Sequence, residues 1–319
     1  MTGPILLTGA TGFVGSHAAE ALAGAGAGLR CTVRASSDPR WIRGLEVETV
    51  QADLRDPDAL AGALEGVGVV VHVAGITRAP GSAAYRRVNV EATARLAGAA
   101  ARRGVRRFVF VSSLAARGPD GAKGPVSAYG RSKREAEERL TGAAEGEVPP
   151  ETVVLRPGGV YGPRDDDLLP LFRMAGRGWL PVPTRGRELQ PVYAADVASA
   201  VRAAALGPAP GLGPWPLVGR SAHPWSEMAA AMEEALGRPV RTFPVPSFAL
   251  VAAGALSETV GRLTGTTPRL DRRRARDLAR HRWTADPAPS EQALGWRPEV
   301  GLAEGLRRTA EWYEERGWL

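Results

Sequence analysis

A glycine-rich loop between a short apolar run and a helix-like segment constrains the fold of this chain more than any other feature. The run Pro4–Leu7 leads into Thr8-Gly9-Ala10-Thr11-Gly12-Phe13-Val14-Gly15. A side chain at either of the first two glycines would hold the backbone away from a pyrophosphate, and one at the third would push helix and strand apart. The start of the helix offers free N–H groups and a partial positive charge to phosphates. Because a strand precedes the loop and a helix follows it, the pattern favours dinucleotide binding over a plain tight turn. The predicted contacts are Gly9, Thr11, Gly12, Phe13, Val14 and Gly15.

Short apolar runs alternate with helix-like segments through the first half of the chain. The runs are Pro4–Leu7, Leu29–Val33, Val47–Val50, Val67–Val73, Phe108–Val111 and Thr152–Leu155. Several are apolar without alternation, as is typical of strands covered on both faces. Stretches with the spacing of amphipathic helices lie between them, over Phe13–Gly26, Ala83–Arg103 and Ser132–Ala144. This order predicts an α/β fold, a Rossmann-like doubly wound parallel sheet with right-handed crossovers.

The composition of the sequence changes after Pro163, where proline and glycine become frequent. Further helices are indicated at Ala194–Leu206 and Trp225–Leu236, and a late strand at Trp215–Val218. The short apolar segment Phe248–Leu256 is interpreted as a core helix, with a substrate-facing or membrane-touching helix as the alternative. Phe172, Trp179 and Phe248 are interpreted as buried packing residues, with aromatic pocket residues as the alternative, and Asp165-Asp166-Asp167 as a solvated helix start. We predict a dinucleotide-binding domain over residues 1–160, with a return segment near 188–220. A smaller C-terminal substrate-binding lobe would comprise mainly 161–187 and 221–319.

Composition and charge exclude several classes of protein. The hydrophobic share of 44% and charged share of 24% over 319 residues are ordinary for a globular protein. No run approaches the roughly 18 apolar residues that span a bilayer, and no secretory leader pattern is present. We therefore expect a cytoplasmic location and no integral membrane segment. The single cysteine, Cys31, rules out an intramolecular disulfide and makes a protein-only zinc cage implausible, so no metal site is predicted.

The net charge of +7 raises the question of nucleic-acid binding. Arginines are spread through the chain, and the one dense run, within 269–280, is interrupted by Asp271 and Asp277. A solvated helix face is the favoured interpretation of that run, and no nucleic-acid partner is predicted. A polyanionic cofactor or an anionic membrane surface would also account for some of the basic excess.

The ends of the next strands indicate which dinucleotide binds. An NAD site usually places an acidic residue after the second strand, but here Arg34, Ser36 and Ser37 follow it. An arginine with hydroxyls suits a 2′-phosphate, so NADP(H) is favoured and NAD(H) remains the alternative. The adenine is expected against Asp53-Leu54, and the small residues of Val73-Ala74-Gly75 would let the backbone approach the dinucleotide. His72 is interpreted as structural.

A serine pair and a tyrosine–lysine pair supply the candidate reacting groups. The fifth strand ends in Ser112-Ser113, and Tyr129 and Lys133 lie four residues apart on a predicted helix, so they share one face. The lysine charge would lower the pKa of the phenol, which could then exchange a proton with a substrate hydroxyl or carbonyl. Ser113 could hold the substrate oxygen, and Lys133 could also hold the nicotinamide ribose.

With these motifs the chain resembles the extended short-chain dehydrogenase/reductase family, also called the NAD-dependent epimerase/dehydratase family. The resemblance runs through Asn89, the arginine–proline segment Arg156–Pro163, Val192–Ala198 and Leu294–Pro298, nearly the whole length. It implies a Ser113, Tyr129, Lys133 triad with a supporting Asn89, cofactor contacts at Ser112, Pro157 and Gly158, and a lobe that closes over the substrate. It also implies a homodimer paired through Ala83–Arg103 and Ser132–Ala144.

Departures from the family pattern narrow the expected substrate. No carboxylate follows the fifth strand, which argues against dehydration, and Gly159 stands where sugar-nucleotide epimerases typically carry an asparagine. The chain is more similar to the reductase and hydroxysteroid-dehydrogenase-like branch, whose substrates are apolar ketones, aldehydes or secondary alcohols. A sugar-nucleotide epimerase is the main alternative. A non-catalytic dinucleotide-sensing protein is a minor one, since such proteins commonly lose the tyrosine or lysine that this chain keeps.

Overall fold

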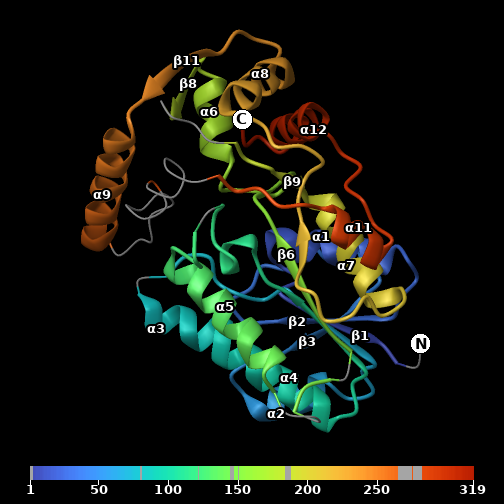
Figure 1. Ribbon diagram of the computed structural model, residues 1–319. Helices are drawn as coiled ribbons and strands as arrows, with labels where there is room; N and C mark the ends of the chain where they lie inside the picture. The colour runs from blue at the N-terminus through green and yellow to red at the C-terminus, as the bar shows by residue number, and fades with distance from the viewer. Residues whose placement is uncertain are drawn as a thin grey trace.

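A seven-stranded parallel sheet forms the centre of the molecule (Figure 1). The computed structural model describes residues 3–79, 81–120, 122–143, 147–149, 151–183, 188–264, 275 and 282–319. The strand order is β10-β6-β5-β4-β1-β2-β3, and it reverses between β1 and β4. The strands are β1 Ile5–Thr8, β2 Leu29–Val33, β3 Glu48–Gln51, β4 Val69–His72, β5 Arg107–Val111, β6 Glu151–Pro157 and β10 Trp215–Leu217. The predicted Rossmann-like doubly wound sheet is confirmed, and its switch point is where such folds bind ligands.

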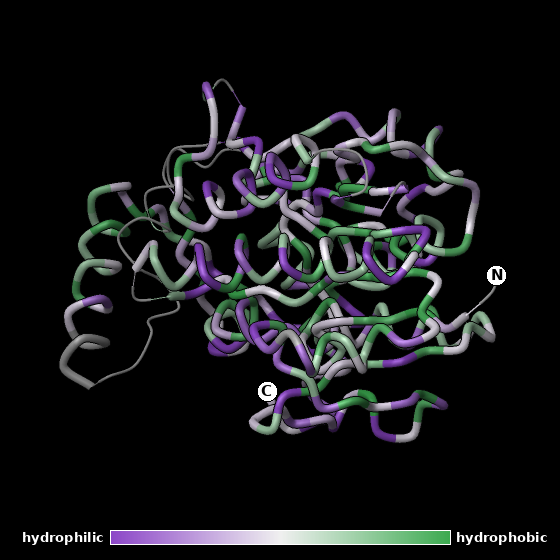
Figure 2. Tube along the Cα trace, turned by 90° about the horizontal axis from the view of Figure 1, so that it is seen from below, coloured by the Kyte–Doolittle hydropathy of each residue, from purple (hydrophilic) through white to green (hydrophobic). Residues whose placement is uncertain are grey.

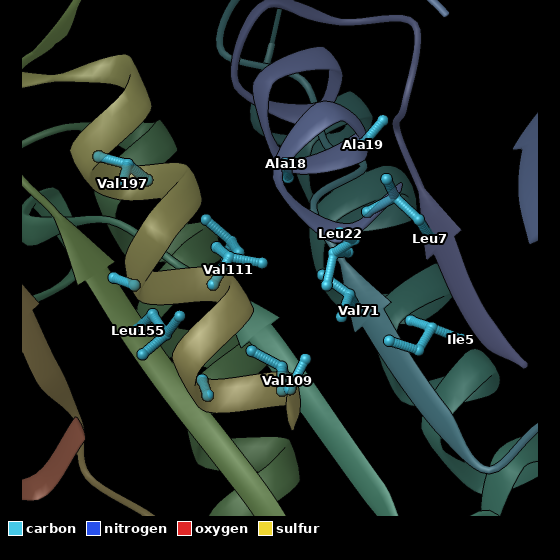
Figure 3. Close-up of a cluster of buried hydrophobic side chains, with 14 of the residues drawn as sticks. Ile5, Leu7, Ala18, Ala19, Leu22, Val71, Val109, Val111, Leu155 and Val197 are labelled. Carbon is cyan, nitrogen blue, oxygen red and sulfur yellow. The ribbon is translucent and has the colours of Figure 1, made fainter. Parts of the chain in front are cut away.

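Side chains that alternate along each strand build two cores, one on each face of the sheet. Figure 3 shows one of them, in which Leu7, Val71 and Val109 meet Leu22 of α1 (Phe13–Ala23) and Val197 of α7 (Ala194–Leu206). The intervening strand residues, such as Leu6, Val70, Phe108 and Phe110, face the opposite core. There they meet α2 (Pro57–Ala63), α4 (Ala92–Arg102) and α5 (Ala128–Thr141). Burial on both faces explains why the strands read as continuous apolar runs.

The structure changes two of the predicted helices next to the sheet. The helix predicted over Ala83–Arg103 is divided into α3 (Ser82–Tyr85), a π-helical segment η1 (Arg86–Glu91) and α4. The helix predicted from Ser132 begins four residues earlier, at Ala128. Ser127 caps it, because its Oγ accepts a hydrogen bond from the backbone N–H of Gly130 at 3.0 Å.

Several of the remaining elements pack around a third apolar cluster. It joins α6 (Leu169–Ala175), α8 (Trp225–Leu236) and α12 (Leu302–Glu315) to the strand β8 (Trp179–Pro183), which pairs with β11 (Arg241–Val245). A second strand pair, β7 (Val160–Tyr161) with β9 (Val192–Tyr193), leads back to α7. The helix α11 (Ala288–Leu294) lies beside β10, and η2 (Leu114–Ala116) follows β5. The exact domain boundaries given above stay a prediction.

Two interpretations of this second half are wrong. The segment Phe248–Leu256 is not a core helix, because α9 (Ser247–Thr264) stands apart from the body in Figures 1 and 2 and leaves Phe248 77% and Leu256 67% exposed. Trp179, interpreted with Phe172 and Phe248 as a buried packing residue, is also exposed, and only Phe172 is buried. An apolar pattern shows that a segment avoids water, but it does not identify what covers the segment.

The aspartates at 165–167, interpreted as a solvated helix start, precede a helix that begins only at Leu169. Asp165 is buried, and its backbone carbonyl accepts a hydrogen bond from the Tyr313 hydroxyl. Among the described residues, no three histidine, cysteine or carboxylate side chains gather as metal ligands, and no helix is long and apolar enough to cross a membrane. The arginine run within 269–280 lies outside the described residues.

Candidate active site

The glycine loop turns from β1 into α1 at the switch point of the sheet. Gly9 has a φ of 79°, and a Cβ there would lie 2.6 Å from the backbone nitrogen of Ala74. A Cβ at Gly15 would collide with the Gly9 carbonyl oxygen, whereas one at Gly12 would meet nothing closer than 3.4 Å. Gly9 and Gly15 are therefore required by the packing of the loop, and the space beside Gly12 is open at the start of α1. No side chain caps that helix.

A chain of buried hydrogen bonds joins this loop to the far side of β4. The backbone N–H of Ala74 donates to Thr8 Oγ1 at 3.3 Å, and Thr8 Oγ1 lies 2.6 Å from His72 Nδ1. His72 Nε2 lies 2.9 Å from Thr93 Oγ1, which donates to the Asn89 carbonyl at 2.8 Å. One tautomer satisfies every partner: Thr8 donates to Nδ1, and Nε2–H donates to Thr93. Burial, together with the charge of Lys133, lowers the pKa of His72 to about 3, so the ring is neutral and structural.

Asn89 is held in place by the π-helical segment η1 and is fully engaged. Its Oδ1 accepts from the backbone N–H of Ile76 at 2.8 Å, and its Nδ2 donates to the Ile76 carbonyl and to Ser132 Oγ, both at 3.0 Å. A Cβ at Gly75 would lie 3.1 Å from Asn89 Oδ1 and 3.4 Å from Lys133 Nζ. The structure thus brings Gly75, Asn89 and Lys133 together beyond the end of β4.

Lys133 is buried on α5, with 4% of its surface exposed. Its Nζ donates to the Val111 carbonyl at 3.0 Å and lies 4.8 Å from the centre of the Phe110 ring. Burial lowers the pKa of Lys133 to about 8, while the carboxylate of Glu137 acts to raise it. Lysine occurs at only two positions in the chain, 123 and 133, although lysine and arginine together number 41. An arginine would stay charged at any pH of interest, so only a lysine offers an ammonium that titrates near neutrality.

Tyr129 and Ser113 lie at the starts of α5 and η2, two helices that contact each other. Tyr129 is in the first turn of α5, four residues before Lys133, and is half-buried with its ring 6.2 Å from that of Tyr85. Ser113 follows β5 and caps η2, because its Oγ accepts from the backbone N–H of Ala115 at 3.2 Å. Accepting as a cap leaves the hydroxyl proton of Ser113 to be donated elsewhere.

The hydroxyl of Ser112 is held by a different partner. It donates to Glu137 Oε1 at 2.5 Å. The same carboxylate accepts hydrogen bonds from Arg156, from Nε at 2.9 Å and from Nη2 at 2.5 Å. The side chain of Ser112 is thus committed to a buried network that joins β5, α5 and β6, and only its backbone is left for a cofactor. The sequence interpretation missed Glu137, although its position one helical turn after Lys133 would have indicated an ion pair.

The predicted adenine end lies where β2 and β3 finish side by side. Arg34 is exposed, makes no ion pair within the described residues, and begins a turn in which its backbone N–H donates to Ser37 Oγ at 3.3 Å. Asp53 is paired with Arg55, Nη2 to Oδ2 at 2.6 Å, and hydrogen bonds from Arg55 lower the pKa of Asp53 to about 2. Asp53 is therefore ionised and already paired with Arg55. Leu54, the next residue, is half-buried.

The predicted contacts after β6 differ in their surroundings. Pro157 is buried, and a Cβ at Gly158 would lie 3.1 Å from Val218 Cγ1 and 3.3 Å from the Gln190 carbonyl. A side chain at Gly158 would therefore fit only tightly against these atoms, whatever the residue binds. Gly159 is exposed, and a Cβ there would meet no atom within 4 Å.

Comparisons with known proteins match this fold over its full length. The sequence profile of the NAD dependent epimerase/dehydratase family matches residues 5–213. A ceramide reductase from Caulobacter vibrioides is 36% identical over 318 residues, which cover 99% of this chain and 96% of the relative. A UDP-glucose 4-epimerase from Vibrio cholerae is 29% identical, covering 96% of this chain and 94% of its own. The solved complex of the Thermus thermophilus UDP-glucose 4-epimerase with NAD has a TM-score of 0.76 and 25% identity, covering 98% of this chain and 99% of that one.

Proposed function

We propose, from the premise that this chain belongs to the NAD dependent epimerase/dehydratase family, that it is an NAD(P)-dependent reductase of apolar ketones. In this proposal a hydride passes between the nicotinamide and a carbonyl or secondary-alcohol carbon of a small apolar molecule. The observation that carries it is the buried ammonium of Lys133, set beside Gly75 and Asn89 and on the same helix face as Tyr129.

The residues around the switch point fit a dinucleotide. The open space beside Gly12 and the uncapped N-terminus of α1 suit a pyrophosphate, and Gly75 leaves room beside Lys133 for a ribose. A nicotinamide bound there would supply or accept the hydride. Arg34, exposed and without a carboxylate partner in the described chain, together with Ser36 and Ser37, supports NADP(H) over NAD(H).

The protein itself would handle the proton. Tyr129 would give its phenolic proton to the substrate oxygen, and Ser113 would donate a hydrogen bond to that oxygen as charge develops on it. The ammonium of Lys133 favours the phenolate left on Tyr129 by attraction of opposite charges. Since the pKa of Lys133 is about 8, the ammonium is the main form at neutral pH. Proton transfer of this kind contributes on the order of a hundred- to ten-thousandfold in rate.

Two observations favour reduction over the other reactions of the family. The described site lacks the side chains that those reactions use, and the chain is similar to a reductase. The segment Ser112-Ser113-Leu114-Ala115 has no carboxylate for an elimination, and the carboxylate of Glu137 is already held by Arg156 and Ser112. Gly159 has no side-chain amide to contact a nucleotide diphosphate. The similarity to a ceramide reductase over 99% of the chain supports a lipid-like ketone as substrate.

The test is NADPH oxidation at 340 nm with a panel of long-chain ketones, including an N-acylated 3-oxo amino alcohol. Wild-type enzyme is expected to consume NADPH, and Tyr129→Phe to lose at least about a hundredfold in kcat with its cofactor affinity retained. Arg34→Ala is expected to raise KM for NADPH far more than for NADH. Full turnover by Tyr129→Phe would contradict the catalytic assignment, and equal effects on the two cofactors would contradict the NADP assignment.

A sugar-nucleotide epimerase is the second candidate, supported by the Vibrio cholerae relative at 29% identity. It predicts the interconversion of UDP-glucose and UDP-galactose with no net NADPH consumption, whereas the reductase leaves both sugars unchanged. We also propose a homodimer paired through α4 and α5, which light scattering would test.

A further inference from the structure

Most of the exposed large apolar side chains gather in one region of the molecule. Six such residues are exposed in the part of the chain that the structure describes, and four of them lie on β8, β11 and α9. We call these four the apolar ridge: Trp179, Phe243, Phe248 and Leu256. Isolated exposed leucines are ordinary on soluble proteins, but a cluster of this kind marks an interaction surface.

The ridge is continuous along the chain. Trp179 on β8 and Phe243 on β11 place their rings 5.7 Å apart on the outside of the two-stranded sheet. β11 ends at Val245, and α9 begins two residues later, at Ser247, so the sheet runs directly into the helix. Figure 1 shows β11 leading into α9, and both views place α9 at the edge of the molecule.

The exposed side of α9 is apolar, the reverse of an ordinary surface helix. Phe248, Ala252 and Leu256 follow one another at four-residue spacing, and all three are exposed. Gly254, on another side of the helix, is buried, so the exposed stripe is the side turned away from the protein. From Ser247 to Ser257 the helix carries no charged residue.

Basic side chains without carboxylate partners accompany the aromatic pair. Arg241 is the register partner of Trp179 across the two strands, and Arg177 lies two residues before Trp179. Neither guanidinium makes a hydrogen bond or an ion pair within the described residues, and both Arg177 and Arg241 are exposed. Tryptophan next to arginine, beside an apolar helix, is typical of the boundary between lipid headgroups and acyl chains.

We propose that the apolar ridge docks on the surface of an anionic lipid bilayer, with Phe248 and Leu256 in the acyl region and Arg177 and Arg241 at the phosphates. The helix would lie in the interface and not cross it, since no described helix is long and apolar enough to span a membrane. A net charge of +7 adds a long-range attraction to such a surface. A second copy fits less well, because a two-fold contact would bring the same unpaired arginines of both copies together. The docking is independent of the reaction proposed above.

Vesicle flotation of the full-length protein tests this proposal. Wild-type protein is expected to float with vesicles of phosphatidylglycerol and phosphatidylcholine and to bind phosphatidylcholine alone much less, with binding to the mixture falling as salt rises. Phe248→Ser and Leu256→Ser are each expected to weaken binding roughly tenfold. Arg241→Gln should weaken binding to the anionic vesicles alone. Leu212→Ser and Arg202→Gln, exposed residues away from the ridge, are matched controls and should bind as wild type does.

Three results would overturn the proposal. These are failure of the wild-type protein to bind anionic vesicles, equal binding to neutral ones, and unchanged binding by both Phe248→Ser and Leu256→Ser. A dimer in light scattering that Phe248→Ser dissociates would assign the ridge to a second copy instead. Thermal unfolding of each variant separates a lost contact from a misfolded protein, and because no turnover is measured, failure here leaves the ketone assay untouched.

Discussion

Replacing Lys133 by methionine is expected to abolish turnover and, at neutral pH, to stabilise the protein. Folding lowers the pKa of Lys133 from 10.5 to about 8, mainly through burial. A difference of this size corresponds to about 3 kcal/mol against the charged side chain at pH 7. Methionine removes that penalty, but it also removes the hydrogen bond to the Val111 carbonyl, worth about 1–2 kcal/mol. The net expectation at pH 7 is a gain of about 1 kcal/mol.

The dependence on pH is the sharper part of this prediction. Between the folded pKa of about 8 and the unfolded value of 10.5, the unfolded wild-type chain holds more protons than the folded one. The free energy of unfolding of the wild type therefore rises with pH across this window, and the variant lacks that contribution. By pH 10 the penalty has largely gone, so the advantage of Lys133→Met should fall by about 2–3 kcal/mol and be lost or reversed.

Urea unfolding of the cofactor-free protein at pH 7 and pH 10, followed by tryptophan fluorescence, measures both values. Lys123→Met is the matched control, because Lys123 is exposed and is the other lysine of the chain. It should change stability little, and equally at the two pH values. If the difference between Lys133→Met and wild type were the same at pH 7 and pH 10, the account of a desolvated ammonium would be refuted.

Three other substitutions test the packing and electrostatics around the site. Gly15→Ala should unfold at lower temperature and lose NADPH binding, measured by fluorescence titration, because the added Cβ overlaps the loop backbone. Arg107→Met should lower the free energy of unfolding by about 3–5 kcal/mol, since this buried guanidinium binds a carboxylate and three carbonyl oxygens. Arg106→Met, an exposed partner of the same carboxylate, should cost less than about 1 kcal/mol. Glu137→Gln should move the basic limb of the kcat/KM profile to lower pH, because the pKa of the neighbouring lysine falls further without the carboxylate, whereas exposed Glu138→Gln should leave the profile unchanged.

The central strands of the sheet were predictable because they are buried on both faces. Leu29–Val33 was predicted with the bounds that the structure has, and the other strands with bounds that differ by at most two residues at either end. The helices Ala194–Leu206 and Trp225–Leu236 also have the predicted bounds. In these segments the apolar pattern directly reflects burial against neighbouring elements, so local sequence and tertiary packing agree.

The sequence-based predictions fall short where a sequence pattern does not specify what a segment or side chain contacts. The apolar run in α9 indicated a core helix, but Phe248 and Leu256 are exposed. The amino-acid sequence of such a helix does not distinguish burial in protein from burial in another apolar phase. The division of the helix at η1 was equally hidden, because Asn89 is placed by hydrogen bonds to Ile76 and Ser132, which are distant in sequence. The bond from the Ser112 hydroxyl to Glu137 was hidden in the same way, and the cofactor contact that the family resemblance implies for Ser112 stays a prediction. The roles of the predicted cofactor and catalytic residues stay predictions that the kinetic tests above address.

The near absence of lysine gives this protein a built-in spectroscopic reporter. Apart from the α-amino group, reductive methylation with isotopic formaldehyde would label one exposed amine and one buried amine. The resonance of the buried amine would be recognised by its titration, since burial lowers the pKa of Lys133 to about 8. The protonation of a single interior nitrogen could thus be followed directly by NMR in a chain of 319 residues. A variant that lacks one of the two lysines would assign the two resonances.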